Sequence, residues 1–581
     1  MIKRMKILAH SIREYRTASL LTPLFVAFEV ILECIIPFLM AQMIDRMTGE
    51  SLNPILGTGV ILIVMAMLSL TCGVLSGRYA ATAGCGFAKN LRKDLFYRIQ
   101  TFSFSDIDRF STASLVTRMT TDVSNVQNAY QMLIRIAVRT PMMLIFSMTM
   151  SIAINARMAL IFLAILPFLG LGLYLISHTV LPIFKRIFVR YDALNNSVQE
   201  NVAGIRVVKS FVRENFEQKK FEKASEEVCS DFTHVERILA LNGPMMMTCI
   251  YTAMLLVSFF GARMIVLSGG TSLTTGQLSS LINYGIQILS SMMMLSMVFV
   301  MITISSESAG RIVEVLQHES TLKAPANALT VVRDGSIDFD NVSFRYNSGS
   351  GRDALTGINL HIASGQTVGI IGSTGSSKTT LIQLISRLYD VTGGSVRVGG
   401  HDVREYDLEA LRRQVAVVLQ KNVLFSGTIR DNLRWGKEDA TDEEIRHACQ
   451  LAHADEFIQT FPDAYDTRIE QGGTNVSGGQ KQRLCVARSL LRHPKILILD
   501  DSTSAVDTRT DALIRRAFAE EIPDTTKIII AQRVSSVENA DMILVMDGGR
   551  IVEQGTHEEL MALKGIYHEI YTIQTRGKEV A

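Results

Sequence analysis

The sequence predicts an α-helical membrane domain, of six spans with long cytoplasmic helical extensions, followed by an α/β domain built around a phosphate-binding loop. The chain has 581 residues, too many for one domain, and its mean hydropathy of +0.24 is high for a soluble protein. Its long apolar stretches all lie in the first half, and the Gly/Ser-rich loop lies in the second. We therefore expect a membrane domain over residues 1–310, a connector over 311–331 and a soluble domain over 332–581.

Six stretches of the first half are long and apolar enough to cross about 30 Å of hydrocarbon as helices. The loops inside successive pairs of spans are short and carry few lysines or arginines. Those residues gather instead before the first span and in two long segments, 78–131 and 182–238. The positive-inside rule therefore places both termini and both long segments in the cytoplasm. The expected spans are 17–44, 55–77, 132–154, 157–181, 239–267 and 277–304.

The two long segments keep a helical periodicity, so we expect them to extend the membrane helices. Their turning points, at about 110–118 and 200–214, are where a soluble domain could dock. The basic, amphipathic residues 1–16 are expected to lie on the cytoplasmic membrane surface as a helix. A net charge of +2 indicates no nucleic-acid partner, and the seven cysteines show neither CxxC pairs nor disulfide spacing.

Two acidic residues, Glu29 and Glu33, fall one helical turn apart inside the first expected span. Ionised groups are costly there unless they face a cavity or a partner, which favours a functional role. The alternative is that one or both lie near the outer membrane boundary or are buried in the protonated form. The sequence leaves the role of this pair open.

The Gly/Ser-rich loop reads Gly-Ser-Thr-Gly-Ser-Ser-Lys-Thr-Thr and joins a short strand pattern to a helical pattern over 378–389. In such a loop, backbone N–H groups form an anion nest at a helix N-terminus, a lysine reaches the outer phosphates and a hydroxyl ligates magnesium. A chance Gly/Ser-rich turn is the alternative for this stretch taken alone. The expected phosphate-binding residues are Gly372, Ser373, Thr374, Gly375, Ser376, Ser377, Lys378, Thr379 and Thr380.

A second signal is the run 495–501, an apolar strand pattern that ends in Asp500 and Asp501. Strand candidates at 336–346, 495–500 and 527–531 alternate with helical patterns, which predicts an α/β core. Ligands bind at the carboxyl edge of such sheets, so Asp500 suits a magnesium shell. A strand merely ended by polar residues is a weaker interpretation once a phosphate loop is present. The second half is therefore expected to be an α/β P-loop nucleotide-binding domain.

The run Asn475-Val-Ser-Gly-Gly-Gln480, followed by Lys481-Gln-Arg, resembles the signature sequence of ATP-binding cassette (ABC) proteins. The whole chain, six spans followed by one cassette, resembles a half-transporter of the ABC exporter type. The segments 110–118 and 200–214 resemble the coupling-helix regions of that family. The resemblance therefore covers essentially the complete chain.

The resemblance implies roles for individual residues. Tyr346 resembles the aromatic residue that stacks on adenine, and residues 504–507 resemble the D-loop of the family. Gln420 resembles the residue that links magnesium to the membrane domain. The implied cofactors are ATP and Mg²⁺, with the metal held by Thr379, Gln420 and Asp500.

In this family two cassettes pair head to tail, so that each ATP lies between one phosphate loop and the opposite signature. The implied partner is a second ABC half-transporter. The hydroxyl, backbone and amide groups of the signature are of the kind that close on a γ-phosphate without adding charge. The residues expected to contact a nucleotide held by the partner are Ser477, Gly478, Gly479 and Gln480.

Three positions depart from the family pattern, on the same side of one ATP site. Asp501 stands where the family has its catalytic glutamate, and its carboxylate reaches about 1.5 Å less, one C–C bond. Gln532 stands in place of the switch histidine and cannot be protonated. Ser377 replaces the glycine that normally precedes the lysine. With Asp501 and Gln532 in the catalytic positions, we expect a degenerate site that binds ATP and hydrolyses it poorly.

We therefore expect one subunit of a heterodimeric, ATP-driven exporter in a bacterial-type plasma membrane. It resembles the degenerate-site subunit of a multidrug exporter, which implies drugs or other amphipathic small molecules as cargo. A homodimer with slow hydrolysis is the alternative assembly. The alternative functions are import of a metal chelator on the exporter fold, and an ATP-gated channel or regulator.

Overall fold

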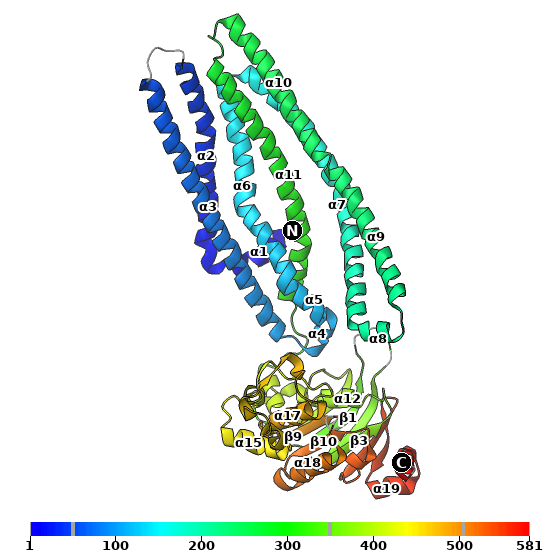
Figure 1. Ribbon diagram of the computed structural model, residues 1–581. Coiled ribbons are helices and arrows are strands. Elements are labelled where there is room, and N and C mark those ends of the chain that lie inside the picture. Colours follow the sequence, from blue (N-terminus) through cyan, green and yellow to red (C-terminus); the bar gives the residue numbers. More distant parts are fainter. Residues whose placement is uncertain (1, 48–52, 347–350, 352, 502–505, 580–581) are drawn as a thin grey trace. The chain divides into compact units, whose positions relative to one another are not determined.

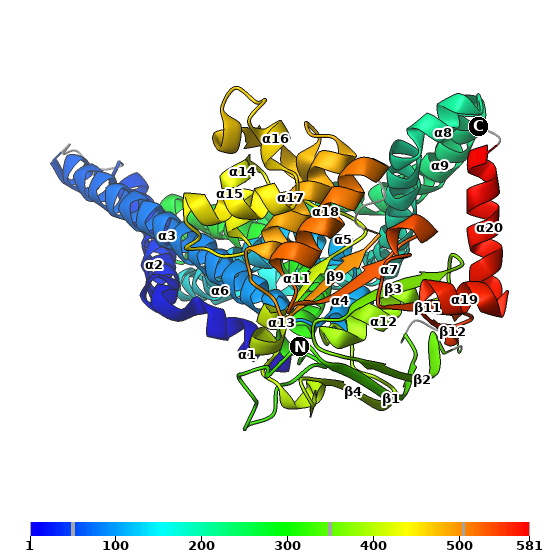
Figure 2. The same cartoon turned by 90° about the horizontal axis from the view of Figure 1, so that it is seen from below.

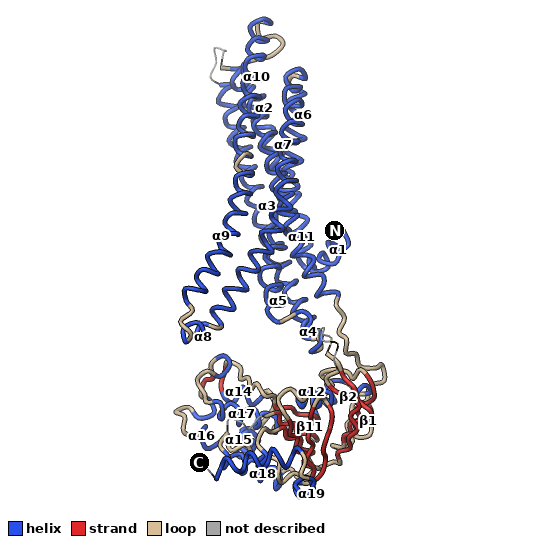
Figure 3. Tube along the Cα trace, turned by 90° about the vertical axis from the view of Figure 1, so that its right-hand side faces the viewer, coloured by secondary structure: helices blue, strands red, loops and turns tan. Residues whose placement is uncertain are grey.

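The computed structural model describes residues 2–47, 53–346, 351, 353–501 and 506–579. The chain forms two compact units (Figure 1). One unit holds residues 1–100 and 112–318, and the other holds residues 101–111 and 319–581. All strands of the described chain lie in the second unit, whereas the first is helical (Figure 3). The predicted fold class is therefore confirmed.

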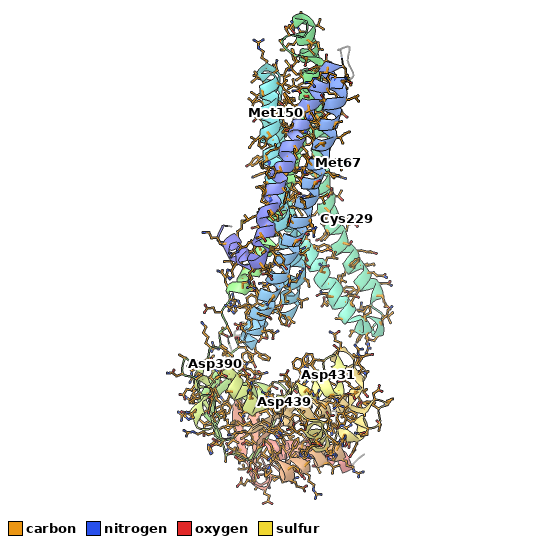
Figure 4. The ribbon with its side chains drawn as sticks, turned by 90° about the vertical axis from the view of Figure 1, so that its left-hand side faces the viewer. Met67, Met150, Cys229, Asp390, Asp431 and Asp439 are labelled. Atoms are coloured by element: carbon orange, nitrogen blue, oxygen red, sulfur yellow. The ribbon has the colours of Figure 1, made fainter. Side chains whose placement is uncertain are left out.

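The first unit contains, among the described residues, six helices long and apolar enough to cross a membrane, as the sequence predicts. Apolar side chains such as that of Met67, which is 58% exposed, point outward from these helices (Figure 4). Such exposure suits a lipid environment. Its elements are α1 (Ile2–Ala9), η1 (His10–Tyr15), α2 (Arg16–Arg46), α3 (Asn53–Gln100), α5 (Thr112–Thr117), η2 (Arg118–Asp122), α6 (Val123–Ile154), α7 (Ala156–Ala203), α8 (Ile205–Ser210), α9 (Glu214–Leu239), α10 (Asn242–Ser268) and α11 (Thr275–Gln317).

Two helix groups make up this unit. In the first, α2 packs along α3 and α6, and α6 packs along α11. In the second, α7, α10 and α11 bury a shared apolar cluster that includes Phe162, Val257 and Leu281. The helices α3 and α7 each run for 48 residues, longer than a bilayer requires, so the expected helical extensions are present.

The turning points of the long extensions differ in how well the sequence locates them. The second is α8, inside the expected range 200–214. The first lies earlier than the expected 110–118, at α4 (Phe104–Phe110), which belongs to the second unit. A capping box between Ser103 and Asp106 starts α4, and Ser111, with a φ of 55°, ends it.

The second unit is built on a six-stranded sheet in the order β12-β11-β3-β10-β9-β6. The inner strands are parallel, and β12 is antiparallel to β11. A four-stranded antiparallel sheet, in the order β2-β1-β4-β5, lies in the same unit. The strands of the two sheets are β1 (Ile337–Phe344), β2 (Leu355–Ile362), β3 (Thr367–Gly372), β4 (Gly393–Val398), β5 (His401–Asp402), β6 (Val415–Val418), β9 (Ile496–Asp500), β10 (Thr526–Ile530), β11 (Met542–Asp547) and β12 (Arg550–Gly555).

The helices of this unit pack around the strands, with α17 and α18 near β9, and α12 near β3 (Figure 2). Acidic side chains such as Asp390, Asp431 and Asp439 belong to this unit (Figure 4). The remaining elements are α12 (Lys378–Ile385), η3 (Val403–Glu405), α13 (Leu408–Gln414), β7 (Gly427–Thr428), α14 (Ile429–Arg434), α15 (Asp442–Leu451), α16 (Asp455–Ile458), η4 (Ala464–Asp466), β8 (Arg468–Ile469), η5 (Gln471–Gly473), α17 (Gly478–Leu490), α18 (Thr508–Glu521), η6 (Val534–Ser536), α19 (His557–Leu563) and α20 (Ile566–Glu579).

The strand order brings the predicted site together. Because β3, β10 and β9 are adjacent and parallel, their carboxyl ends meet at one edge of the sheet. The phosphate loop follows β3, the acidic pair ends β9, and residue 532 follows β10. In the register, Ile530 of β10 lies beside both Ile370 of β3 and Asp500 of β9.

Candidate nucleotide site

The phosphate loop connects β3 to α12 and folds around its own lysine. The ammonium group of Lys378 donates to the carbonyl oxygens of Gly372 and Ser373, each at 2.8 Å, and to the hydroxyl of Ser376 at 3.2 Å. Burial lowers the pKa of Lys378, and the carboxylates of Asp500 and Asp501 oppose that shift. The lysine is thus held at the mouth of the loop, where phosphate oxygens could replace the carbonyl oxygens as its acceptors.

The backbone conformation of the loop favours glycine at two positions, Gly372 and Ser377. A Cβ on Gly372 would lie 2.1 Å from the carbonyl oxygen of Met546, so only glycine fits beside β11. Ser377 has a φ of 70°, in the left-handed region where glycine is usual. Its Cβ costs about 1–2 kcal/mol at such a position, yet its backbone N–H remains in the loop. Ser373, Thr374 and Gly375 are exposed, as a phosphate cradle requires.

The predicted magnesium ligands meet at the start of α12. The hydroxyl of Thr379 donates to Asp500 Oδ2 at 2.9 Å, and Asp500 is only 2% exposed. Burial raises the pKa of Asp500, and the hydrogen bond from Thr379 and the charge of Lys378 offset that shift only in part. A hydroxyl and a carboxylate oxygen, with the amide of Gln420 nearby, are ligands that Mg²⁺ prefers. The donor set fits this ion.

The two residues expected at the catalytic positions, Asp501 and Gln532, contact each other directly. Gln532 donates its side-chain N–H to Asp501 Oδ2 at 2.7 Å. Gln420 also forms a hydrogen bond with Asp501, and both bonds oppose the burial that raises its pKa. Asp501 has a φ of 49°, a left-handed conformation that is uncommon outside glycine. The carboxylate of Asp501 therefore accepts hydrogen bonds from two amide side chains.

Tyr346 lies beside the loop in an aromatic cluster. Its hydroxyl shares a hydrogen bond with Thr380 at 3.0 Å and donates to Gln383 at 3.2 Å. Its ring makes edge contacts with Phe344 and Tyr389, at centroid distances of 4.8 and 5.3 Å. Both neighbours were missed by sequence reasoning, because neither belongs to a motif.

Tyr389 also connects this cluster to α4. Its hydroxyl donates to Asp108 Oδ2 at 2.7 Å, and burial, together with that carboxylate, raises the pKa of Tyr389. The helical pattern extends to this residue, but α12 ends at Ile385. Arg387 then adopts a left-handed conformation, with a φ of 49°, and pairs with Asp390 at 2.8 Å. The chain therefore leaves the helix before it reaches Tyr389.

The signature run forms the N-terminus of α17. Ser477 caps this helix: its Oγ accepts from the backbone N–H of Gln480 at 3.3 Å, and its own N–H donates to the Gln480 side chain at 2.9 Å. The hydroxyl hydrogen of Ser477 is not used in this cap, and Ser477 and Gly478 are exposed. Of the expected D-loop, Ser504 and Ala505 lie outside the described residues, and Asp507 caps α18.

In the membrane unit, the two glutamates of α2 share one arginine of α6. Arg139 Nη2 donates to both carboxylate oxygens of Glu33, at 2.8 and 2.7 Å, and Nη1 donates to Glu29. Ser76 of α3 donates to Glu29 at 3.4 Å, and Glu29 is only 6% exposed. We call these four residues the intramembrane ion cluster. The sequence analysis did not single out Arg139. Its position as a charged residue inside the third expected span was the signal that could have identified it.

Two family models match the sequence. "ABC transporter transmembrane region" matches residues 20–292, and "ABC transporter" matches residues 355–504. The chain is also similar to an uncharacterized ABC transporter ATP-binding protein, YfiB, of Bacillus subtilis (strain 168). The two are 36% identical over 547 residues, which cover 94% of each chain.

Two further matches cover nearly the whole chain. An ATP-dependent lipid A-core flippase of Desulfotalea psychrophila is 30% identical over 584 residues, covering 98% of this chain and 99% of the flippase. A solved structure of a bacterial Atm1-family ABC exporter with ATP bound superposes with a TM-score of 0.82. It covers 97% of this chain and 98% of its own, at 24% identity, which shows a shared fold.

Proposed function

Because the chain belongs to the ABC transporter family, with a membrane region and one cassette in a single polypeptide, we propose that it is one half of a heterodimeric exporter driven by ATP. It binds ATP and is an ATPase whose hydrolysis is coupled to transport. The proposal adds three points to the family assignment: a partner chain of different sequence, a slow site on this chain, and export of amphipathic molecules.

The hydrogen bond between Gln532 and Asp501 is the observation that carries the proposal. A general base must accept a proton from the attacking water, and a misplacement of about 1 Å can cost roughly a hundredfold in rate. Here one carboxylate oxygen already accepts from an amide, and the side chain is one C–C bond shorter than glutamate. The side chain of Gln532 cannot gain or lose a proton. It therefore cannot change its own charge when charge develops on the γ-phosphate, as a histidine could.

Binding of ATP does not require the side chains of Asp501 and Gln532. Lys378 offers three N–H donors, and the loop presents its backbone N–H groups at the N-terminus of α12. Thr379 and Asp500 would hold Mg²⁺, together with Gln420, and the ion would neutralise charge on the β- and γ-phosphates. We therefore propose that ATP is retained at this site for much longer than one transport cycle.

The signature, in contrast, shows none of these departures from the family pattern. The hydroxyl hydrogen of Ser477 is not used in the helix cap, and Ser477 and Gly478 are exposed where α17 begins and presents its backbone N–H groups. We propose that these groups close on ATP held by the phosphate loop of a second half-transporter. That partner would carry glutamate and histidine at the two positions altered here.

The distribution of lysine and arginine supports cytoplasmic termini and a cytoplasmic cassette, in a plasma membrane. Amphipathic cargo is supported by the relative that is named a lipid A-core flippase. Small drugs or lipid-like molecules are the cargo that we propose, and they would move outward.

Co-purification tests the assembly. The tagged chain would be extracted from its native membrane, and whatever remains bound after gel filtration would be sequenced. A second half-transporter with glutamate and histidine at the two positions supports the heterodimer, whereas recovery of this chain alone, as a dimer, refutes it. Flux of a fluorescent amphiphile in sealed inside-out vesicles tests direction, because an exporter accumulates it and an importer does not.

A further inference from the structure

We propose that an apolar groove beside the N-terminal helix of this chain binds one acyl chain of an anionic phospholipid, with the lipid headgroup at Lys6. The groove lies entirely within the membrane unit and has a cavity volume of about 480 Å³. That volume is within the range of about 300–1,000 Å³ that is typical of small-molecule sites. The inference concerns a lipid site that is separate from the nucleotide site.

Four segments form the groove. The N-terminal segment covers one side, and α3, α6 and α11 form the remainder. Most of the side chains along it are apolar. They include Leu8, Ile12, Phe87, Val126, Leu133 and Ile302.

Two of the polar groups in the groove already have partners. The Tyr130 hydroxyl shares a hydrogen bond with Ser19 at 2.6 Å, and the Ser305 hydroxyl donates to the backbone oxygen of Asn125 at 3.2 Å. A ligand therefore need not supply hydrogen bonds to Tyr130 or Ser305. A hydrocarbon chain gains free energy there without leaving a buried polar group unsatisfied.

The rim of the groove carries a positive charge. Lys6 lines it, is exposed, and has no acidic partner in the described part of the chain. Two acids near the N-terminal segment are engaged elsewhere: Asp94 pairs with Arg13 at 2.7 Å, and Glu14 accepts from Asn90 at 3.2 Å. The sequence of α1 is itself basic, with no acidic residue. A phosphate at the rim complements this charge.

The place of the groove in the chain also suits a lipid. It opens where α1 and η1 lead into the first membrane span, and where α3, α6 and α11 continue into their long extensions. A basic segment next to a span lies at the height of lipid headgroups. A chain entering the groove from that height would run along the bundle, as lipid chains do.

Lipid retention by the purified assembly provides the test. Native mass spectrometry would count bound palmitoyl-oleoyl phosphatidylglycerol and, separately, phosphatidylcholine. Two variants probe the two parts of the site: Lys6→Glu reverses the charge, and Ala129→Trp fills the groove. Their matched controls are Lys223→Glu, at an exposed position of α9, and Leu160→Trp, at an exposed position of α7.

Lys6→Glu changes the charge at the rim by two units. We expect each unit to reduce the preference for phosphatidylglycerol over phosphatidylcholine by roughly fivefold. Ala129→Trp should remove the retained lipid whatever its headgroup, and both controls should bind as wild type. If Ala129→Trp lowers the melting temperature, Lys6→Glu still tests whether the headgroup lies at Lys6, because this exposed side chain can be changed without altering the packing. Equal retention in all variants would overturn the proposal. So would a groove variant that keeps its lipid and loses binding of a transported dye, because the groove would then hold cargo.

Discussion

Replacing Ser477 by alanine tests which of the two ATP sites in the assembly hydrolyses ATP quickly. The change removes two interactions. The first is the cap of α17, worth about 1 kcal/mol of stability. The second is the free hydroxyl hydrogen, which the proposal assigns to a phosphate held by the partner. A hydrogen bond to a charged group is worth about 1.5–3 kcal/mol, so we expect ATPase to fall about ten- to a hundredfold.

A matched variant separates the two losses. Thr441 caps α15 with the same capping box, made with Glu444, so Thr441→Ala loses a cap and no phosphate contact. Steady-state ATPase of the co-expressed pair would be measured for both variants after gel filtration has confirmed assembly. Lys378→Ala forms the third arm: it should weaken nucleotide retention at the slow site and leave part of the turnover. Near-total loss from Lys378→Ala, with Ser477→Ala no worse than Thr441→Ala, would make this chain's own phosphate loop the fast one.

Three further changes test the remaining structure. Asp501→Glu alone should not raise steady-state ATPase several-fold, because Gln532 still occupies the switch position and groups that act as a unit are not additive; a several-fold rise would contradict the degenerate-site argument. Arg139→Ala should destabilise the membrane unit by about 3–5 kcal/mol, since it leaves two glutamates unpaired, and should lower the melting temperature more than Arg139→Lys. Tyr389→Phe should reduce the stimulation of ATPase by amphipathic cargo, because it cuts the bond to α4, while Tyr465→Phe, which loses a comparable bond to a carboxylate, should not; equal effects would indicate general destabilisation.

Local patterns in the sequence were sufficient to locate the membrane spans, the phosphate loop and the acidic end of β9. Hydropathy over about twenty residues is enough to locate a span, because a helix needs that length of apolar surface to cross the bilayer. The phosphate loop and the acidic end of β9 were visible because their residue types and spacing carry their own chemistry. The departures from the family pattern at Asp501 and Gln532 could likewise be recognised from the sequence alone.

The contacts between distant residues were decided only by the tertiary structure. Gln532 reaches Asp501 because β10 and β9 are parallel neighbours in a register that aligns Ile530 with Asp500, and no local pattern contains that register. Arg139 lies more than a hundred residues from the glutamates of α2, so their pairing follows from helix packing and not from periodicity. The same holds for the hydrogen bond between Tyr389 and Asp108 of α4, which lie 281 residues apart. Side-chain chemistry is local, whereas the partner of each side chain depends on which elements pack together.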